Sequence, residues 1–341
     1  MMSKTILITG ATGYIGAWTV KIALEKGYTV HATVRNLKDK NKYQFLQKFA
    51  NNSVGSIKFF EADLLKEGSF DEAMKNCDWV FHIASPFTLR FKDAEKELLI
   101  PALKGTENIL QSANKNLNIK NVIVTSSVAA ICGDNKDMAD LGLSEFNEDY
   151  FNTTSSATHQ PYSYSKIIAE KKAWELSVEQ SHYKLKVINP GFVLGPSISS
   201  NSNSESLNFM KDILSGKFLI GAPDLMFGFV DVRDVAKAHI LAAENNDFTG
   251  RCIVVNQNYN VIQLAKVIAN FYPQTWKLPK FKAPKFLLKL VAPLFGVTAK
   301  FIENNVGHPI YFNSDKSKKV LGIQYIPIQN TLKDMIESLK S

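Results

Sequence analysis

The sequence Thr-Gly-Ala-Thr-Gly-Tyr-Ile-Gly, residues 9–16, decides the fold of this chain. It lies between a strand-like run, residues 5–9, and a segment with helical periodicity. In this setting Gly10 allows a tight turn, Gly13 lets the backbone approach a pyrophosphate, and Gly16 lets helix and strand pack closely. The helix N-terminus then presents unpaired N–H groups to the phosphates. The motif predicts a dinucleotide site with contacts from Gly10, Thr12, Gly13, Tyr14, Ile15 and Gly16.

Short apolar runs alternate with longer helical segments over the first 190 residues. The runs have an almost continuous apolar character, which suits strands buried on both faces of a sheet; they fall at 5–9, 29–34, 57–61, 79–83, 122–125 and 185–189. Helices are predicted after residue 13, over 94–115 and over 162–180. Such alternation is typical of helices covering a parallel sheet. We therefore predict an α/β fold, a Rossmann-type doubly wound parallel sheet with a smaller C-terminal substrate-binding region.

The organisation changes after Pro190. Residues 197–206 hold six serines and two asparagines, a polar loop composition. Residues 229–243 are predicted as a strand running into a helix, 252–256 as a further strand, and the remainder as an irregular helical cap. We predict a nucleotide-binding domain over 1–190, to which 229–256 return, and a substrate-binding cap formed by 191–228 and 257–341.

The end of the second predicted strand indicates which nicotinamide cofactor is used. NAD-selective sites place Asp or Glu there, to accept a hydrogen bond from the ribose 2′-hydroxyl. This chain has Arg35 instead, which can pair with the 2′-phosphate of NADPH. A charge-assisted contact of this kind contributes about 1.5–3 kcal/mol. We therefore expect NADP(H) to be the cofactor, with Lys38, Lys40 or Lys42 as additional cationic partners.

Further cofactor contacts are expected where the next strands end, because ligands bind at the carboxyl edge of such sheets. Asp63 and Leu64 follow the third strand, where a carboxylate can accept from the adenine amino group. The fourth and fifth strands contribute Ile83, Ala84, Ser85 and Ser126.

The chemistry is predicted at Tyr162 and Lys166, which open a helix after the fifth strand. Positions i and i+4 share a helix face, so Lys166 is a neighbour of Tyr162 and not of Tyr164. A nearby ammonium favours the phenolate, and we expect it to lower the pKa of Tyr162 from its ordinary value near 10. Tyr162 would then protonate a carbonyl oxygen as hydride arrives. The oxygen needs a second donor, for which Ser127 is the candidate.

Taken together, these motifs resemble the extended short-chain dehydrogenase/reductases. The resemblance is greatest to the group containing dihydroflavonol 4-reductase, cinnamoyl-CoA reductase and yeast methylglyoxal reductase. It covers nearly the whole chain, and is weakest in the 197–206 loop and after residue 257. The segments that carry it, besides the glycine loop and Tyr162/Lys166, are 80–87, 99–102, 105–106, 125–127, 189–196 and 229–236.

The resemblance implies a Ser127–Tyr162–Lys166 triad in which Lys166 also holds the nicotinamide ribose. It further implies an apolar substrate pocket and a nicotinamide that delivers hydride from its pro-S face. The nicotinamide would be lined by Pro190, Gly191, Phe192 and Val193, and the substrate pocket by Phe87, Val128 and Phe192.

The predicted function is NADPH-dependent reduction of a small, apolar or aromatic aldehyde or ketone to the alcohol. A hydroxysteroid-type dehydrogenase stays open, since it also favours an apolar pocket. A nucleotide-sugar epimerase or dehydratase shares the fold and triad, but Arg35 disfavours NAD and residues 128–130 lack the acidic pair of a dehydratase. A non-catalytic NADP(H) sensor would not need Tyr162 and Lys166.

The composition of the 341 residues limits the kinds of partner that we expect. The net charge is +8, but the lysines are scattered and no nucleic-acid-binding signature occurs, so no nucleic acid is expected. The apolar stretch 286–297 is short and contains Lys289, so we expect no stable membrane insertion. Three widely spaced cysteines form no metal or disulfide pattern, which favours a reducing, cytoplasmic location without a metal. We expect a monomer or homodimer.

Overall fold

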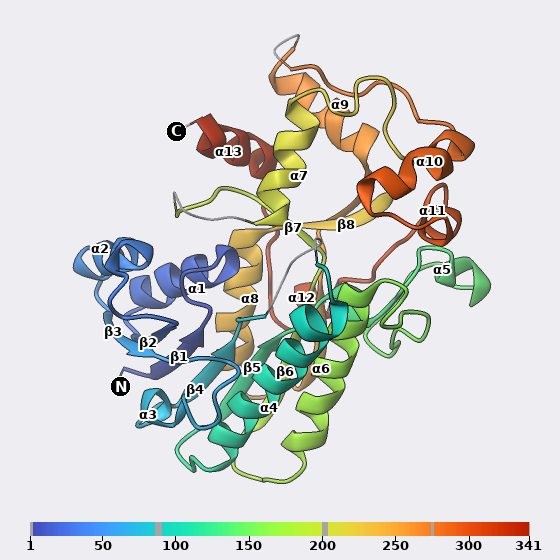
Figure 1. Cartoon of the computed structure of the whole chain (residues 1–341). Coiled ribbons are helices and arrows are strands. Elements are labelled where there is room, and N and C mark those ends of the chain that lie inside the picture. The colour runs from blue at the N-terminus through green and yellow to red at the C-terminus, as the bar shows by residue number, and fades with distance from the viewer. Residues whose placement is uncertain (1–2, 86–90, 200–203, 274–275, 341) are drawn as a thin grey trace.

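The computed structural model describes residues 3–85, 91–199, 204–273 and 276–340. Its centre is a seven-stranded parallel sheet with the order β3-β2-β1-β4-β5-β6-β9 (Figure 1). The strands are β1 (Thr5–Thr9), β2 (Thr29–Val34), β3 (Ser56–Glu61), β4 (Trp79–His82), β5 (Asn121–Thr125), β6 (Lys184–Pro190) and β9 (Gly250–Val254). The predicted doubly wound parallel sheet is confirmed.

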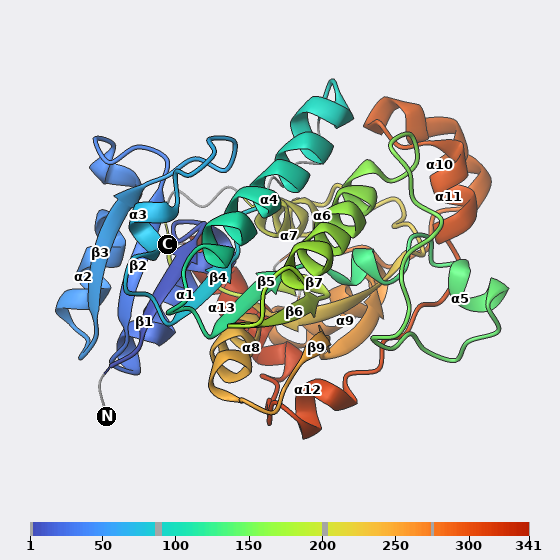
Figure 2. The same cartoon turned by 90° about the horizontal axis from the view of Figure 1, so that it is seen from below.

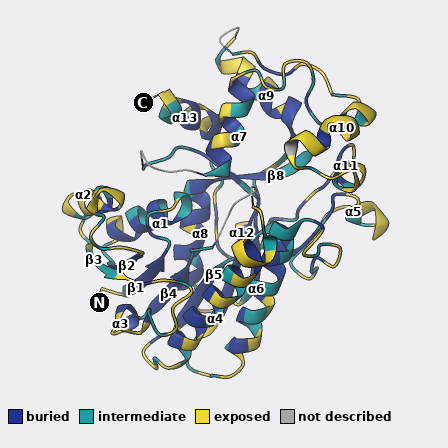
Figure 3. Cartoon of the chain, in the orientation of Figure 1, coloured by how far each residue is buried: buried dark blue, intermediate teal, exposed yellow. Residues whose placement is uncertain are grey.

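Helices cover both faces of this sheet and enclose two separate apolar cores. On one face α1 (Tyr14–Glu25) packs beside α8 (Val232–Glu244), with α2 (Gln44–Asn51) next to α1. On the other face α4 (Ile100–Asn114) and α6 (Pro161–Ser177) run side by side (Figure 2). Six of the seven strands are almost wholly buried, which explains their continuous apolar runs, whereas the edge strand β3 is partly exposed (Figure 3).

The helix predicted over 94–115 has a different first turn. Residues Glu95–Leu99 form a π-helical turn that continues directly into α4. Pro101 follows at the second position of α4, and a proline lacks the N–H and crowds the carbonyl of the preceding turn. A widened turn relieves that crowding while the chain stays helical.

The smaller region has a three-stranded sheet of its own, with the order β10-β8-β7. Its strands are β7 (Phe192–Leu194), β8 (Met226–Asp231) and β10 (Gln257–Asn260), and β8 pairs parallel with β7 and antiparallel with β10. Helices α7 (Glu205–Leu214), α9 (Val261–Phe271) and α13 (Ile328–Lys340) surround it with a third core. The segment 229–256 is therefore divided: its first strand pairs here, and α8 and β9 join the large sheet.

Shorter elements complete the chain. They are α3 (Asp71–Met74), α5 (Asp137–Asp140), α10 (Lys285–Val291), α11 (Ala299–Asn305), α12 (Asp315–Lys319) and the 3-10 turns Lys40–Lys42, Val128–Ala130 and Ala292–Phe295. On α10, Leu288 packs toward Ile302 of α11, whereas Phe286 and Leu290 are 70% and 76% exposed. Within the described ranges, no helix is both long enough and apolar enough to cross a bilayer.

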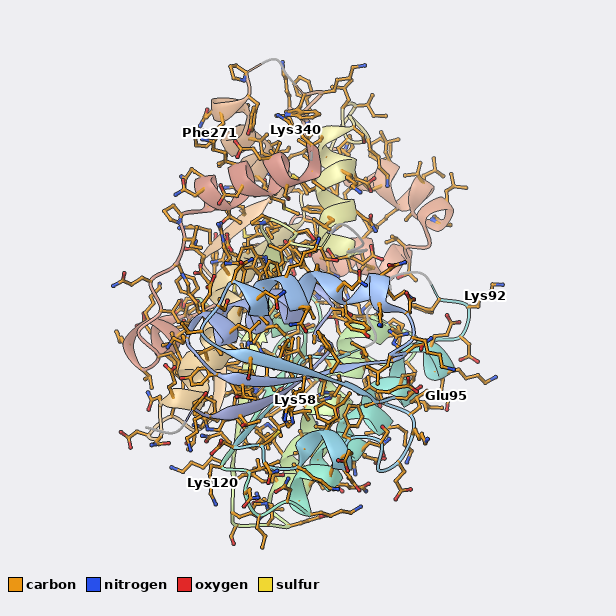
Figure 4. All side chains as sticks on the ribbon, turned by 90° about the vertical axis from the view of Figure 1, so that its left-hand side faces the viewer. Lys58, Lys92, Glu95, Lys120, Phe271 and Lys340 are labelled. Atoms are coloured by element: carbon orange, nitrogen blue, oxygen red, sulfur yellow. The ribbon has the colours of Figure 1, made fainter. Side chains whose placement is uncertain are left out.

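Basic residues lie on several faces of the molecule. Lys92, Lys120 and Lys340 lie on widely separated parts of the molecule, and each is exposed (Figure 4). Several other lysines are neutralised by surface carboxylates, as in the pair between Lys26 and Glu244 at 2.6 Å. The positive net charge is therefore spread over the surface.

Candidate active site

The glycine loop lies between β1 and α1, against the end of β4. Gly10 has a φ of +64°, and a Cβ there would stand 2.9 Å from the backbone of Ala84. A Cβ on Gly16 would stand 2.0 Å from the carbonyl oxygen of Gly10, so only glycine allows this approach of helix to loop. Thr9 fixes the same junction, because its hydroxyl accepts the N–H groups of Ile83 and Ala84 at 3.1 and 3.0 Å.

The N-terminus of α1 meets the requirements of a phosphate site. Gly13 is its N-cap, is exposed and makes no side-chain capping bond, so the first N–H groups of the helix remain available to an anion. Thr12 is partly exposed beside it. The side chains of Tyr14 and Ile15 are used elsewhere: the Tyr14 hydroxyl donates to the carbonyl of Gly195 at 2.5 Å, and Ile15 packs against the core. Only their backbone can serve a cofactor.

The predicted adenosine contacts lie along the ends of β2 and β3. Arg35 follows β2 directly and is exposed. Lys42 is also exposed, but it pairs with Asp39 at 3.0 Å. Asp63 is exposed, and its Oδ1 accepts the N–H of Leu65 at 2.8 Å. Leu64 packs against Gly105, where a Cβ would stand 3.2 Å from its side chain.

Helix α6, which carries Tyr162 and Lys166, has a defined start. Pro161 occupies its first position, where a missing N–H costs nothing, and Gln160 precedes it with a φ of +55°. The Gln160 amide donates to the carbonyl of Gly133 at 2.7 Å and to the carboxylate of Asp134 at 2.6 Å. These bonds fix the turn that brings Tyr162 to the sheet edge.

Tyr162, Lys166, Ser127 and Ser85 meet at this edge. The Lys166 ammonium lies 5.6 Å from the centre of the Tyr162 ring, and the Tyr162 hydroxyl is hydrogen-bonded with the side chain of Ser127. Lys166 also donates to the Ser85 hydroxyl at 3.0 Å. Side chains from β4, β5 and α6 thus come together as the sequence predicted, and the link from Lys166 to Ser85 is a contact that it did not.

The pKa values of the pair differ from the sequence expectation. Burial raises the pKa of Tyr162 well above its ordinary value, and the hydrogen bond with Ser127 offsets this only in part. The expected lowering by Lys166 is therefore wrong. Burial also acts on Lys166 and lowers its pKa to about 8, while the charge of Glu170 raises it. Burial disfavours the charged form of each group and is the largest cause of both shifts.

Ser126 makes a contact that its expected place beside the cofactor did not suggest. It is 5% exposed, and its hydroxyl donates to the carboxylate of Glu170 at 2.5 Å. Glu170 is 1% exposed and also pairs with Arg251 of β9 at 2.6 Å. Sequence reasoning missed Glu170 and Arg251. The available signal was the spacing of Tyr162, Lys166 and Glu170, which places all three on one face of α6.

The residues that the sequence assigns to the nicotinamide and the substrate are apolar or aromatic. Pro190, Gly191 and Val193 are buried at the end of β6 and the start of β7. Phe192 is partly exposed, and its ring centre lies 5.0 Å from that of Phe209. The cluster continues with Phe227 and Phe229, which sequence reasoning did not connect to the site. Val128 is partly exposed beside Ser127, and Phe87 lies outside the described residues.

Such a site, at the carboxyl edge of a doubly wound parallel sheet, defines an NAD(P)-dependent oxidoreductase. Residues 6–261 match the NAD dependent epimerase/dehydratase family, and the chain belongs to it. Within that family it belongs to the extended short-chain reductase group that includes dihydroflavonol 4-reductase, cinnamoyl-CoA reductase and methylglyoxal reductase.

The relatives cover the chain almost completely. A cinnamoyl-CoA reductase from Medicago truncatula is 34% identical over an alignment of 342 positions, which covers 99% of this chain and 96% of that protein. Gre2 from Candida albicans, solved with NADPH, is 30% identical, with a TM-score of 0.77 and 99% and 98% of the two chains covered. The yeast methylglyoxal/isovaleraldehyde reductase Gre2, solved with NADPH, is 28% identical, with a TM-score of 0.74 and 98% of each chain covered.

Proposed function

We propose that this chain is an NADPH-dependent carbonyl reductase that converts an apolar or aromatic aldehyde or ketone to its alcohol, with Tyr162 as proton donor. The observation that carries the proposal is the meeting of Tyr162, Lys166 and Ser127 beside the glycine loop. A sensor that only binds the dinucleotide has no need of this arrangement. The two Gre2 structures hold NADPH, and Arg35 suits its 2′-phosphate.

The proposed cofactor residues fit a dinucleotide phosphate. The uncapped start of α1 at Gly13 and the cradle at Gly10 and Gly16 suit the pyrophosphate. Arg35 and Lys42 suit the 2′-phosphate, Asp63 the adenine, and Lys166 with Ser85 the nicotinamide ribose. We propose that 1–190 form this cofactor unit together with α8 and β9, the part of 229–256 that joins the large sheet. The remaining ranges, 191–228 and 257–341, would form the substrate cap.

In the proposed mechanism Tyr162 gives its hydroxyl proton to the carbonyl oxygen of the substrate. Its raised pKa keeps the phenol protonated at neutral pH, ready to donate. Ser127 lies against the phenol and is placed to donate a hydrogen bond to the same carbonyl oxygen. As the proton leaves, the Lys166 ammonium stabilises the phenolate that forms. Bound NADPH supplies the hydride that reduces the carbonyl carbon.

Apolar walls favour an apolar or aromatic substrate. Phe192 and Val128 border the site, and Phe209 and Phe227 extend the aromatic surface behind Phe192. Three free, buried cysteines suit the reducing environment of the cytoplasm, where we propose that the enzyme works.

The test combines a substrate screen with one substitution. NADPH oxidation is followed with methylglyoxal, cinnamaldehyde, a flavanonol and a ketosteroid. Tyr162→Phe should lower kcat/KM for the best substrate by about 10²–10⁴-fold, because a positioned proton donor is lost. The affinity for NADPH should change little. Tyr164→Phe, two residues along the same helix, is the matched control and should stay active. Unchanged turnover in Tyr162→Phe would remove Tyr162 from the mechanism.

A further inference from the structure

Glu170 is a buried carboxylate on the catalytic face of α6. It follows Lys166 by one helical turn, as Lys166 follows Tyr162, and it is 1% exposed. An ionised carboxylate in such a place requires several partners that compensate for lost hydration. Burying the Glu170 carboxylate costs hydration free energy, and this cost falls directly beside the proposed catalytic pair.

The structure provides a partner for every side of this carboxylate. Oε2 accepts from the Ser126 hydroxyl at 2.5 Å and from the Asn189 amide at 3.0 Å. Oε1 pairs with the Nε atom of Arg251 at 2.6 Å and accepts from the Trp174 indole at 3.4 Å. Two of these partners stand at the ends of β5 and β6, so the carboxylate joins the catalytic helix to the sheet edge.

Arg251 is the cation that faces this carboxylate. It is 6% exposed, and its guanidinium also donates to the carbonyls of Glu148 and Tyr150 at 2.9 and 2.5 Å. A third bond runs to the carbonyl of Ala130 at 3.3 Å. The guanidinium is thus anchored by neutral acceptors, and Glu170 is its carboxylate partner.

Lys166 and Glu170 line one small cavity. The cavity has room for about one water molecule and is also lined by His82, Ser85 and Ser126. The charged and titratable groups around Lys166 are Tyr162 and Glu170 on α6, His82 on β4, and Arg251 on β9 behind Glu170. Burial and the charge of Lys166 lower the pKa of His82 to about 3, so this imidazole is neutral. Within the described part of the chain, Glu170 is the anion in this surrounding.

We propose that Glu170, on the same face of α6 and lining the same cavity, is a positioning residue that stabilises the Lys166 ammonium beside Tyr162. This inference rests on the proposed function, in which the Lys166 ammonium stabilises the Tyr162 phenolate. Glu170 touches neither substrate nor cofactor and acts through Lys166. Ser126 and Asn189, in turn, hold the carboxylate in place.

This role predicts the direction in which the pH dependence of turnover shifts when the charge of Glu170 is removed. Burial lowers the pKa of Lys166 to about 8 and the charge of Glu170 raises it, so removing that charge lowers it further. Turnover needs the ammonium and is lost as the pH rises through this pKa. A shift from 8 to 7 would reduce the protonated fraction at pH 8 from about a half to about a tenth, a roughly fivefold loss. At pH 6 the loss should be below about twofold.

The experiment is a pH profile of kcat/KM for the full chain with NADPH and the faster of methylglyoxal and cinnamaldehyde. In Glu170→Gln the basic limb should move to lower pH. Glu170→Asp keeps the charge on a shorter stem, and its limb should lie between the two. Glu175→Gln is the control, since Glu175 sits on the same helix with its side chain 62% exposed and paired with Lys172. Its limb should stay in place.

A basic limb that stays in place in folded Glu170→Gln overturns the proposal. If Glu170→Gln does not fold, Glu170→Asp decides: a limb below that of the wild type supports the role, and an unmoved limb overturns it. The proposed function is tested separately. Full turnover in Tyr162→Phe refutes that function, whereas an inactive Tyr162→Phe together with an unmoved limb refutes the role of Glu170 alone.

Discussion

Arg35→Gln should weaken NADPH binding without affecting NADH. Arg35 follows β2 directly and is exposed, and no described residue forms an ion pair with its guanidinium. Its charge is therefore available to a 2′-phosphate. A charge-assisted hydrogen bond contributes about 1.5–3 kcal/mol, and exposure with salt screening places this site at the low end. We expect about a tenfold rise in the Kd of NADPH.

Lys42→Gln is the matched comparison. Lys42 carries the same charge in the same region, but it already pairs with Asp39 at 3.0 Å. A phosphate would have to compete with that carboxylate, and an exposed ion pair contributes about 0–1 kcal/mol. The Kd of NADPH should therefore rise by less than about fivefold in Lys42→Gln.

The assay is a titration of each variant with NADPH and with NADH, followed by nicotinamide fluorescence at low and at high salt. The difference between wild type and Arg35→Gln should shrink at high salt, because ions screen an exposed contact. An unchanged ratio of the two Kd values would refute the role of Arg35. The ratio also stays unchanged if both cofactors lose affinity equally, and such a loss could not come from the 2′-phosphate, which NADH lacks.

Two substitutions test how the site is supported. Gly16→Ala places a Cβ 2.0 Å from the carbonyl oxygen of Gly10, so backbone must move, and urea unfolding should show a loss of about 1–3 kcal/mol. Gly13→Ala, whose Cβ would stand 3.2 Å from the same oxygen, should lose less, and an equal loss would contradict the packing argument. Arg251→Met leaves the buried carboxylate of Glu170 without its cation and should lose about 3–5 kcal/mol in the same assay. A loss below about 1 kcal/mol would show that Glu170 is satisfied by its neutral partners.

The large sheet could be predicted because its signals are local. The runs at 5–9 and 29–34 match β1 and β2 residue for residue, since each apolar run ends at a sharp change of composition. The smaller sheet could not be predicted in the same way. β10 is the polar sequence Gln-Asn-Tyr-Asn, which has no apolar alternation and becomes a strand only by pairing with β8. The cap was therefore expected to be irregular and helical, and part of it is a sheet.

The candidate site was predictable where its geometry follows from spacing. Tyr162 and Lys166 are four residues apart on a helix, and Ser127 follows a strand, so their meeting needs only the parallel sheet. The direction of the Tyr162 pKa was not predictable, because it depends on how completely α6, β4 and β5 exclude water around the phenol. Burial of this kind is a property of the assembled layers and of no single motif.

The position of Glu170 on the helix could be predicted from the sequence, but its burial could not. The spacing of 162, 166 and 170 is visible, but oppositely charged residues at i and i+4 also form exposed pairs on helix surfaces. What separates the two interpretations is Arg251, which lies 81 positions further along and reaches Glu170 only because β9 adds to the sheet beside β6. The cation from this distant strand offsets the free-energy cost of burying the Glu170 carboxylate. The face of α6 that carries Tyr162, Lys166 and Glu170 therefore depends on the last strand of the sheet. A substitution of Arg251 in β9 should change the surroundings of the Tyr162 phenol.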